Sequence, residues 1–206
     1  MSRVLPILFN TEMVRAILDG RKSCTRRIVK PQQLIVMLPD KCKNGAPEEF
    51  LKEKKLMFKP YCDMTDIELI NAAYKAPYQP GDILYVRETW KKAPNGYYYY
   101  EDWKRNDIAD ITKWKPSIHM PKEAARIWLK VTDVRVELLQ EITSEQIGRE
   151  GVEVEYPHVL NGEEKRYAFS TLWNSTVKKS DLDRYGWNAN PWVWVIEFER
   201  CEKPEE

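Results

Sequence analysis

Pro191-Trp-Val-Trp-Val-Ile-Glu-Phe-Glu199 is the stretch that decides the class of fold. Large apolar side chains alternate along it with Val193, Val195 and Glu197, which is the period of two that a β-strand gives its side chains. We therefore expect a strand here. Strand spacing also favours a core position for its tryptophan and phenylalanine side chains over stacking on bases.

Other strands are predicted upstream. Leu5–Phe9 is a short apolar run suited to a buried strand, and Ile83–Trp90 follows a turn signal at Gly81 with branched and aromatic residues. The segment 127–136 alternates apolar and polar residues, with a bulge expected near Asp133. A turn at Pro94-Asn-Gly96 predicts a hairpin that leads into four consecutive tyrosines, Tyr97–Tyr100.

Short helices are expected between these strands. Asn10 or Thr11 can cap a helix that ends at Gly20 and carries Met13, Val14, Ile17 and Leu18 on one stripe. The segment Ile142–Gly151 has a capping box, Thr143 with Gln146, and a glycine stop. A further helix face is formed by Phe169, Leu172, Trp173 and Val177.

Separated strands interrupted by short helices predict an α+β fold, namely a small mixed β-barrel with helical decorations. The length of 206 residues fits a single domain that spans 1–206. Residues 32–80 carry high charge and little periodicity, so we expect an insertion there that packs outside the barrel.

Composition excludes several classes of protein. The 33 basic and 32 acidic residues give a net charge of +1, so the molecule is not a polycation as a whole, although six basic residues against Asp19 alone lie between Arg15 and Lys30. No apolar run is long enough to cross a membrane and the N-terminus does not resemble a signal peptide, so we expect a cytoplasmic protein without a membrane partner. Four scattered cysteines and two distant histidines predict neither disulfides nor a metal site, and no cofactor is indicated.

Four blocks of sequence point to a family. They are Leu5–Arg27 with its Gly-Arg-Lys-x-x-Thr-Arg-Arg segment, Gly81–Trp90, Trp114–Pro121 and Asn190–Val195. In these blocks the chain resembles the ASCH-domain family of the PUA-like superfamily, in its longer phage and prophage type. The resemblance implies a PUA-like β-barrel in which the Gly-Arg-Lys segment borders a cleft suited to RNA or a nucleotide.

One branch of that family, a small bacterial acetylcytidine amidohydrolase, is similar around the same motif. The resemblance places its catalytic residues at Lys22, Thr25 and Glu150, the last through the helix that begins after Thr143. Such a Lys can activate a Thr hydroxyl only if burial or nearby cations lower its pKa. Arg21, Arg26 and Arg27 supply such cations, whereas a close Glu150 would raise the lysine pKa.

The leading functional hypothesis is binding of RNA or a nucleotide-like ligand, with Arg21, Arg26 and Arg27 in the cleft and Arg87 as a secondary binding residue. The alternative is a hydrolase that acts on acetylcytidine or on RNA. A third class is a phage module that binds a host protein, for which an exposed aromatic patch at Tyr97–Tyr100 is the physical sign. For Arg21, Lys22, Arg26 and Arg27 the competing interpretation is a solvated turn after a helix, and His119 is expected to be structural.

Overall fold

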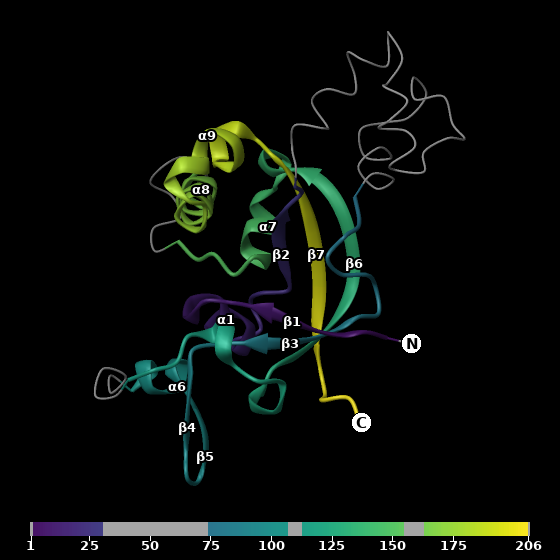
Figure 1. Ribbon diagram of the computed structural model, residues 1–206. Coiled ribbons are helices and arrows are strands. Elements are labelled where there is room, and N and C mark those ends of the chain that lie inside the picture. Colours follow the sequence, from purple (N-terminus) through teal and green to yellow (C-terminus); the bar gives the residue numbers. More distant parts are fainter. Residues whose placement is uncertain (1, 31–73, 107–112, 155–162, 206) are drawn as a thin grey trace, which may run out of the picture.

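The structure is a computed structural model that describes residues 2–30, 74–106, 113–154 and 163–205. Its centre is a curved five-stranded sheet with the order β1-β3-β6-β7-β2 (Figure 1). The strands are β1 (Val4–Leu8), β2 (Cys24–Ile28), β3 (Ile83–Arg87), β6 (Trp128–Leu138) and β7 (Trp192–Cys201). β1 pairs with β3 in parallel, and the other neighbouring strands are antiparallel.

The predicted first helix is α1 (Thr11–Leu18). Asn10 is its N-cap, since the side chain of Asn10 accepts a hydrogen bond of 2.9 Å from the backbone N–H of Met13. Val14 and Ile17 are buried in the core, and Gly20, with a φ of +75°, follows the C-cap Asp19. This confirms both ends of the helix that the sequence predicts.

β7 is buried on both of its faces, and this divides the core in two. Trp194, Ile196 and Phe198 pack into one cluster with residues of β1, β3, β6 and α1, whereas Val193 and Val195 pack into a second. The expected core position of Trp194 and Phe198 is confirmed. The expected bulge on β6 is also present, where the register with β7 shifts between Val131 and Asp133.

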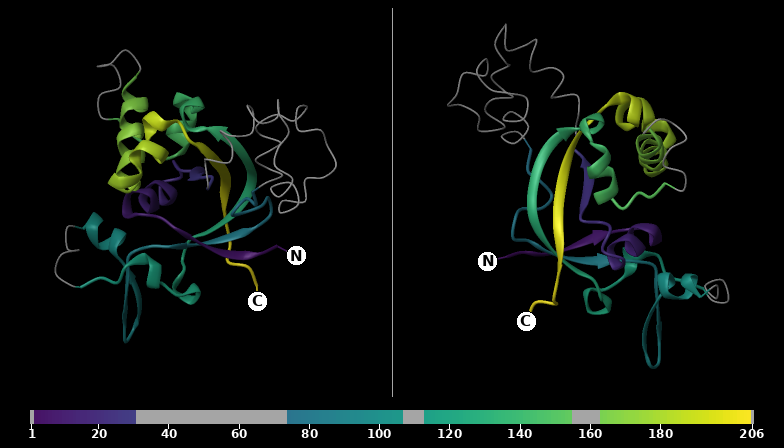
Figure 2. Two further views of the ribbon diagram at one scale, coloured as in Figure 1. Left: turned by 45° about the horizontal axis from the view of Figure 1, so that its top comes forward. Right: turned by 180° about the vertical axis from the view of Figure 1, so that it is seen from behind.

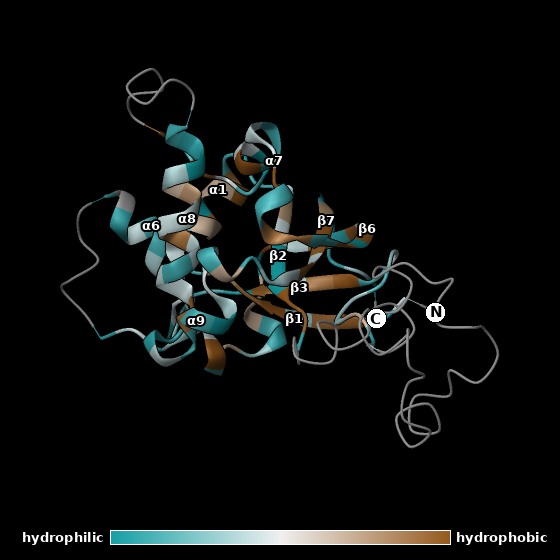
Figure 3. Cartoon of the chain, turned by 90° about the horizontal axis from the view of Figure 1, so that it is seen from above, coloured by the Kyte–Doolittle hydropathy of each residue, from teal (hydrophilic) through white to brown (hydrophobic). Residues whose placement is uncertain are grey.

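The second core cluster lies between the sheet and two helices, α7 (Ser144–Arg149) and α8 (Glu164–Thr176), and a short helix, α9 (Leu182–Tyr185), follows α8 along the chain. Phe169 and Trp173 of α8 and Ile147 of α7 contribute the buried side chains. The views in Figure 2 place these helices together on one side of β2 and β7, and Figure 3 shows the hydrophobic residues concentrated in the strands. Short 3-10 helices span Ser117–His119, Lys122–Ala124, Leu139–Glu141, Lys179–Asp181 and Trp187–Ala189.

The strand predicted for Ile83–Trp90 is two elements. β3 ends at Arg87, and Trp90 begins a separate hairpin of β4 (Trp90–Ala93) and β5 (Gly96–Tyr99), which leads into α6 (Tyr100–Arg105). The chain leaves the sheet at Glu88, whose carboxylate is buried against Arg126 with Nε–Oε1 and Nη2–Oε2 distances of 2.9 Å. The predicted turn before Tyr97–Tyr100 is present.

The fold is therefore α+β, as expected. Among the described residues the hydrogen-bonded sheet is open, with β1 and β2 as its two edges. The predicted insertion lies mostly outside these residues, but Tyr78, near its end, packs on the core and donates a hydrogen bond of 2.9 Å to the carbonyl of Pro6. No helix in the described part of the chain is long and apolar enough to span a membrane.

Candidate functional site

The Gly-Arg-Lys segment and the end of α7 meet because two backbone turns hold them together. After α1, the N–H groups of Arg21 and Lys22 both donate to the carbonyl of Ala16, at 2.8 and 3.0 Å, and the N–H of Ser23 then donates to the carbonyl of Arg149 at 2.8 Å. These bonds fix the entry to β2 beside the last turn of α7.

Gly151 allows α1 and the Lys22 segment to approach the end of α7 closely. Its φ is +87°, and a Cβ atom on it would lie 2.6 Å from the Cβ of Ala16 and 3.1 Å from the Cβ of Lys22. A residue with a side chain would therefore push α1 and the Lys22 segment away from α7. The glycine that was predicted as a helix stop also sets the distance between the two halves of the site.

Lys22, Glu150 and Arg26 form a buried ion cluster. The Nζ of Lys22 donates to the Oε2 of Glu150 at 2.7 Å and to its backbone carbonyl at 2.8 Å, and the Nη1 of Arg26 reaches Oε1 at 3.2 Å. The Lys22 side chain is fully buried, and its Nζ lies 5.5 Å from the centre of the Phe9 ring. The structure thus brings together Lys22 and Glu150, which are separated by 128 residues.

Arg26 is neutralised by acidic partners rather than open to a ligand. Its Nη2 donates to Glu137 at 3.0 Å and to the side-chain oxygen of Gln146 at 3.1 Å. The Nε of Arg26 is buried and has no hydrogen-bond partner among the described residues. Arg26 therefore acts mainly to hold the carboxylates of Glu150 and Glu137.

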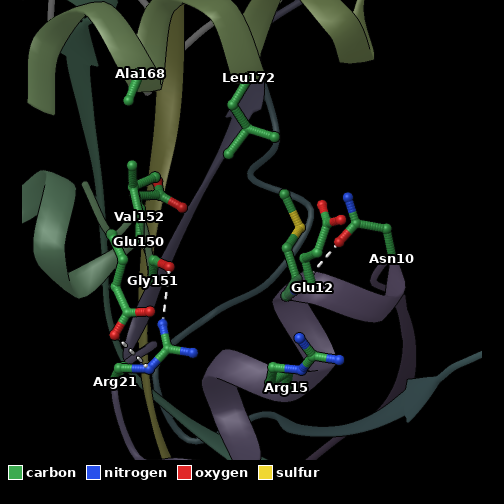
Figure 4. A pocket seen from close by; sticks show the side chains of 11 residues that line it. Asn10, Glu12, Arg15, Arg21, Glu150, Gly151, Val152, Ala168 and Leu172 are labelled. Atoms are coloured by element: carbon green, nitrogen blue, oxygen red, sulfur yellow. Dashed lines mark hydrogen bonds and ion pairs between the residues drawn. The ribbon is translucent and has the colours of Figure 1, made fainter. Parts of the chain in front are cut away.

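Two pockets adjoin this cluster, and Figure 4 shows the larger one. It has a volume of about 320 Å³ and lies between α1, the Glu150–Val152 turn and α8. Its polar lining comes from the side chains of Asn10, Glu12, Arg15, Arg21, Glu150 and Glu153. A smaller pocket of about 40 Å³ shares Met13, Glu150 and Leu172 with the larger one and adds Thr25, Arg26 and Arg27.

The three predicted catalytic residues differ in their access to these pockets. Glu150 lines both pockets, Thr25 lines the smaller one, and Lys22 lines neither. Thr25 is buried on β2, opposite Ile196 of β7. Glu150 is therefore the member of this trio through which a ligand in the larger pocket can contact the ion cluster.

The remaining predicted binding residues are also engaged with protein groups. Arg21 lines the larger pocket but pairs with Asp19 and Glu153, each at 3.1 Å, and donates to the carbonyl of Gly151 at 3.1 Å. Arg27 donates to the carbonyl of Leu8 at 3.0 Å, and burial lowers the pKa of its guanidinium. The basic cluster expected from the sequence is compensated by neighbouring oxygens.

Arg87 lies apart from this site. It lines neither pocket, and its guanidinium donates to the carbonyl of Ile118 at 3.3 Å and to the Tyr85 hydroxyl at 3.4 Å. Arg87 is the last residue of β3 and pairs in register with Leu8 of β1, so it lies on the β1 side of the sheet. His119, expected to be structural, is exposed at the end of a 3-10 helix.

Sequence reasoning did not predict several residues of the site. Asn10 and Glu12 enter it through the first turn of α1, and Arg15 lines it while binding the buried Glu101 of α6 at 2.7 Å. The apolar stripe of the helix could have predicted these three residues, because polar positions on the face beside Met13 point away from the core. Glu101 and Glu137 had no local signal.

Cys24 also lies in this neighbourhood. It is buried, and burial, together with the charge of Glu150, raises the pKa of its thiol to about 12. A thiol in this state is protonated at neutral pH and is a poor nucleophile. No group of three or more His, Cys, Asp or Glu side chains within the described ranges is arranged to hold a metal ion.

Comparisons of the chain with protein-family models, with curated proteins and with solved structures found no match.

Proposed function

We propose that the chain is an ASCH-type protein whose larger pocket binds a nucleoside-sized ligand. The observation that carries the proposal is the 2.7 Å contact between Lys22 and Glu150, because it joins the Gly-Arg-Lys segment to the end of α7 at the wall of that pocket. The block Leu5–Arg27 that resembles the family contains Lys22, and the similarity to the amidohydrolase branch supplies Glu150.

The PUA-like barrel is part of this proposal. β1 and β2, the two sheet edges, approach one another through side chains, since the guanidinium of Arg27 on β2 binds the carbonyl of Leu8 on β1. Arg27 also lies 5.6 Å from the ring centre of Phe9, which follows β1. A barrel closed by side chains and by α1 agrees with the strong curvature of β6 in Figure 1.

The charge of the pocket favours a neutral polar ligand over a polyanion. Three carboxylates, Glu12, Glu150 and Glu153, line it together with two arginines, Arg15 and Arg21, and both arginines already hold carboxylates. RNA binding through this cleft would rest on phosphate contacts, which need unpaired cations. A nucleoside instead offers a base edge and hydroxyls, and a volume of about 320 Å³ lies at the lower end of the range for small-molecule sites.

Titration calorimetry with cytidine, acetylcytidine and uridine tests the binding proposal. A Leu172→Trp substitution is expected to abolish binding, because Leu172 lines both pockets and the larger ring fills them without changing a charge. Glu145→Gln is the matched control, since Glu145 is an exposed carboxylate in the first turn of α7. The proposal fails if none of the nucleosides binds, or if binding survives in the Leu172→Trp variant.

Hydrolysis of an acetylated cytosine nucleoside is the second candidate, favoured by the presence of Thr25 and Glu150 in one pocket. Lys22 would first pass a proton to Glu150 across their hydrogen bond. The Thr25 oxygen would then attack the amide carbonyl carbon while its proton moves to the Lys22 amine. Cleavage of the C–N bond releases the cytosine amine with that proton, and water hydrolyses the Thr25 ester to acetate.

Incubation of the pure protein with acetylcytidine tests this reaction, with cytidine and acetate as the measured products. Thr25→Val is expected to abolish turnover and keep binding, because valine has the shape of threonine without the hydroxyl, and Thr25→Ser is expected to retain turnover. A mixed RNA incubated in parallel distinguishes a ribonuclease by cleaved ends. Turnover that persists after loss of Thr25 and of Lys22 contradicts the mechanism.

A further inference from the structure

The β4–β5 hairpin has two faces with different surroundings. It projects away from the sheet in all views of Figures 1 and 2. In its register Trp90 pairs with Tyr99 and Lys92 with Tyr97, so these residues share one face, whereas Lys91 and Tyr98 share the other. The first face is covered, because Trp90 packs on Met120 and Ala124 and the Tyr99 hydroxyl donates to the carbonyl of Ala124 at 2.7 Å.

The second face continues into a row of aromatic rings. Tyr98 contacts Trp103 with ring centres 6.1 Å apart, Trp103 contacts Trp114 at 5.4 Å, and Trp114 contacts Tyr100 at 5.5 Å. We call these four residues the aromatic chain. Its interplanar angles of 85°, 81° and 89° are edge-to-face, so no two of its rings stack in parallel. All four side chains are partly exposed.

The charge around the aromatic chain is basic. Residues 90–126 contain eight basic and five acidic residues, whereas the rest of the chain is net negative. Lys104 and Lys113, next to Trp103 and Trp114, are exposed and form no ion pair with a described residue. Of the acidic residues of this segment that the structure describes, Glu101 binds Arg15, Asp102 binds Arg126 and Glu123 accepts a hydrogen bond of 3.0 Å from the Tyr97 hydroxyl.

We propose that the aromatic chain and its flanking lysines form a binding surface for single-stranded nucleic acid, separate from the nucleoside pocket. Aromatic side chains give unpaired bases a stacking platform, and lysines neutralise the phosphates that connect them. Lysine is depleted in the cores of protein–protein interfaces, which makes a protein the less suitable occupant of this surface. Duplex nucleic acid keeps its bases stacked on each other and cannot use the rings.

The test is fluorescence anisotropy with labelled oligouridine and oligothymidine of about 12 nucleotides, a length within the usual site size for single-strand binding. The wild-type protein is expected to bind both and to bind a duplex of the same length more weakly. Affinity should fall between about 50 and about 200 mM salt. Absence of binding at the lower salt concentration overturns the proposal and leaves a protein partner for this surface.

The lysines are tested by the double variant Lys104→Gln/Lys113→Gln. The slope of log affinity against log salt should become shallower by about 1.4, since each phosphate contact with a single strand contributes about 0.7. Lys178→Gln/Lys179→Gln is the matched control, because this exposed pair lies between α8 and α9. Equal effects in the two double variants would show non-specific attraction and would reject the surface.

The rings are tested by Tyr98→Leu and Tyr98→Phe. Loss of a stacking ring should weaken binding about 5- to 150-fold, whereas the phenylalanine variant should bind like the wild type. Thermal unfolding of both variants checks that they fold. If Tyr98→Leu unfolds at a lower temperature than the wild type, the salt dependence of the lysine variants is the test of the proposed surface. The Leu172→Trp variant, in which the nucleoside pocket is filled, should keep oligonucleotide binding, so that failure of one proposal does not imply failure of the other.

Discussion

Glu150 joins both buried cations of the candidate site. Its two carboxylate oxygens bind Lys22 and Arg26, and its backbone carbonyl accepts a second bond from Lys22. Both cations are fully buried as side chains. Removing the carboxylate therefore leaves two buried positive charges with fewer partners, which is costly in an interior of low dielectric constant.

We expect Glu150→Gln to lower the free energy of unfolding by about 3–5 kcal/mol, the cost of breaking a buried ion pair from one side. Lys22→Met should cost less, because Glu150 keeps Arg26 and methionine fills the space near the Phe9 ring. Urea denaturation of the two variants and of the wild type measures the difference. A larger loss for Lys22→Met than for Glu150→Gln would contradict this assignment.

Gly151 and Gly81 are a matched pair of positions with which the close approach of α1 to α7 can be tested. Both have positive φ, +87° and +88°, but a Cβ on Gly81 meets nothing within 4 Å whereas one on Gly151 meets Ala16 at 2.6 Å. Gly81→Ala should therefore cost about 1–2 kcal/mol of backbone strain. Gly151→Ala should cost clearly more, because the clash adds to the same strain.

Chemical denaturation of the two alanine variants tests this prediction, and a third variant identifies the clash. Adding Ala16→Gly to Gly151→Ala should recover part of the loss, although glycine in α1 itself costs about 1 kcal/mol. Equal losses for Gly81→Ala and Gly151→Ala would mean that the backbone around Gly151 relaxes.

At the level of elements, α7 links helix capping to the site. The Thr143 hydroxyl accepts a hydrogen bond of 3.2 Å from the N–H of Gln146, and the Gln146 side chain accepts one of 2.9 Å from the N–H of Thr143 and another from Arg26. The side-chain oxygen of Gln146 is the acceptor of both bonds, so the same glutamine caps the helix and helps to hold the arginine that binds Glu150.

Thr143→Ala should lower the free energy of unfolding by about 1 kcal/mol, as loss of an N-cap usually does. Gln146→Ala should cost more, because it removes the reciprocal bond and also one acceptor of the buried Arg26. Thr143→Ser is the control that keeps the cap. Urea midpoints are the measurement, and an unchanged midpoint in Gln146→Ala would exclude this link.

Sequence reasoning succeeded for elements with local signals. The cap of α1, the capping box of α7, the bulge of β6 and the hairpin turn were all predictable, because each depends on residues within a few positions of one another. The end of β3 at Arg87 was not, since the buried Glu88 is held by Arg126, which lies 38 residues away.

The same distinction explains the site. That Lys22 meets Glu150 followed from a family resemblance, and composition alone showed only a basic segment near the first helix. Neutralisation of that segment depends on partners that lie far along the chain, as Glu137 does for Arg26, 111 residues away. A count of local charges therefore overestimated the cations available to a ligand.

For the whole molecule, the ion cluster of the site continues across the sheet. Glu137 binds Arg26 and Arg135, and Glu197 binds Arg135 and Arg149, each at 3.0 Å or less. Arg149 connects this network back to the site, because its Nε donates a hydrogen bond of 3.2 Å to the hydroxyl of Ser23, the residue after Lys22. Charges of α7, β2, β6 and β7 are thus joined in one network.

This network makes stability depend on pH. Burial alone would raise the pKa of Glu197, but hydrogen bonds from Arg149 and Arg135 outweigh it, so the pKa of Glu197 lies below its usual value. A carboxyl with a lowered folded-state pKa stabilises the protein above its unfolded pKa of about 4.3, and the contribution is lost as pH falls through the folded-state pKa.

Glu197→Gln should therefore be less stable than the wild type at pH 7, and the difference should narrow as the pH falls below about 4.3. Thermal unfolding across this range is the measurement, with Glu202→Gln, an exposed carboxylate after β7, as the control. A difference from the wild type that is the same at neutral and acidic pH would show that Glu197 acts by packing instead.

The sheet order has a consequence for the way the protein is made. Among the described strands β2, which carries Thr25 and Arg26, pairs with β7 alone, and β7 follows every other described element along the chain. During synthesis on the ribosome, β2 therefore has no β7 to pair with until more than 160 further residues have been made, the separation between Ile28 and Trp192. Contacts this distant form slowly. Shortened nascent chains that stop before β7 should thus lack the β2–β7 pairing that supports Thr25 and Arg26, and the unpaired β2 strand of such chains is exposed to aggregation.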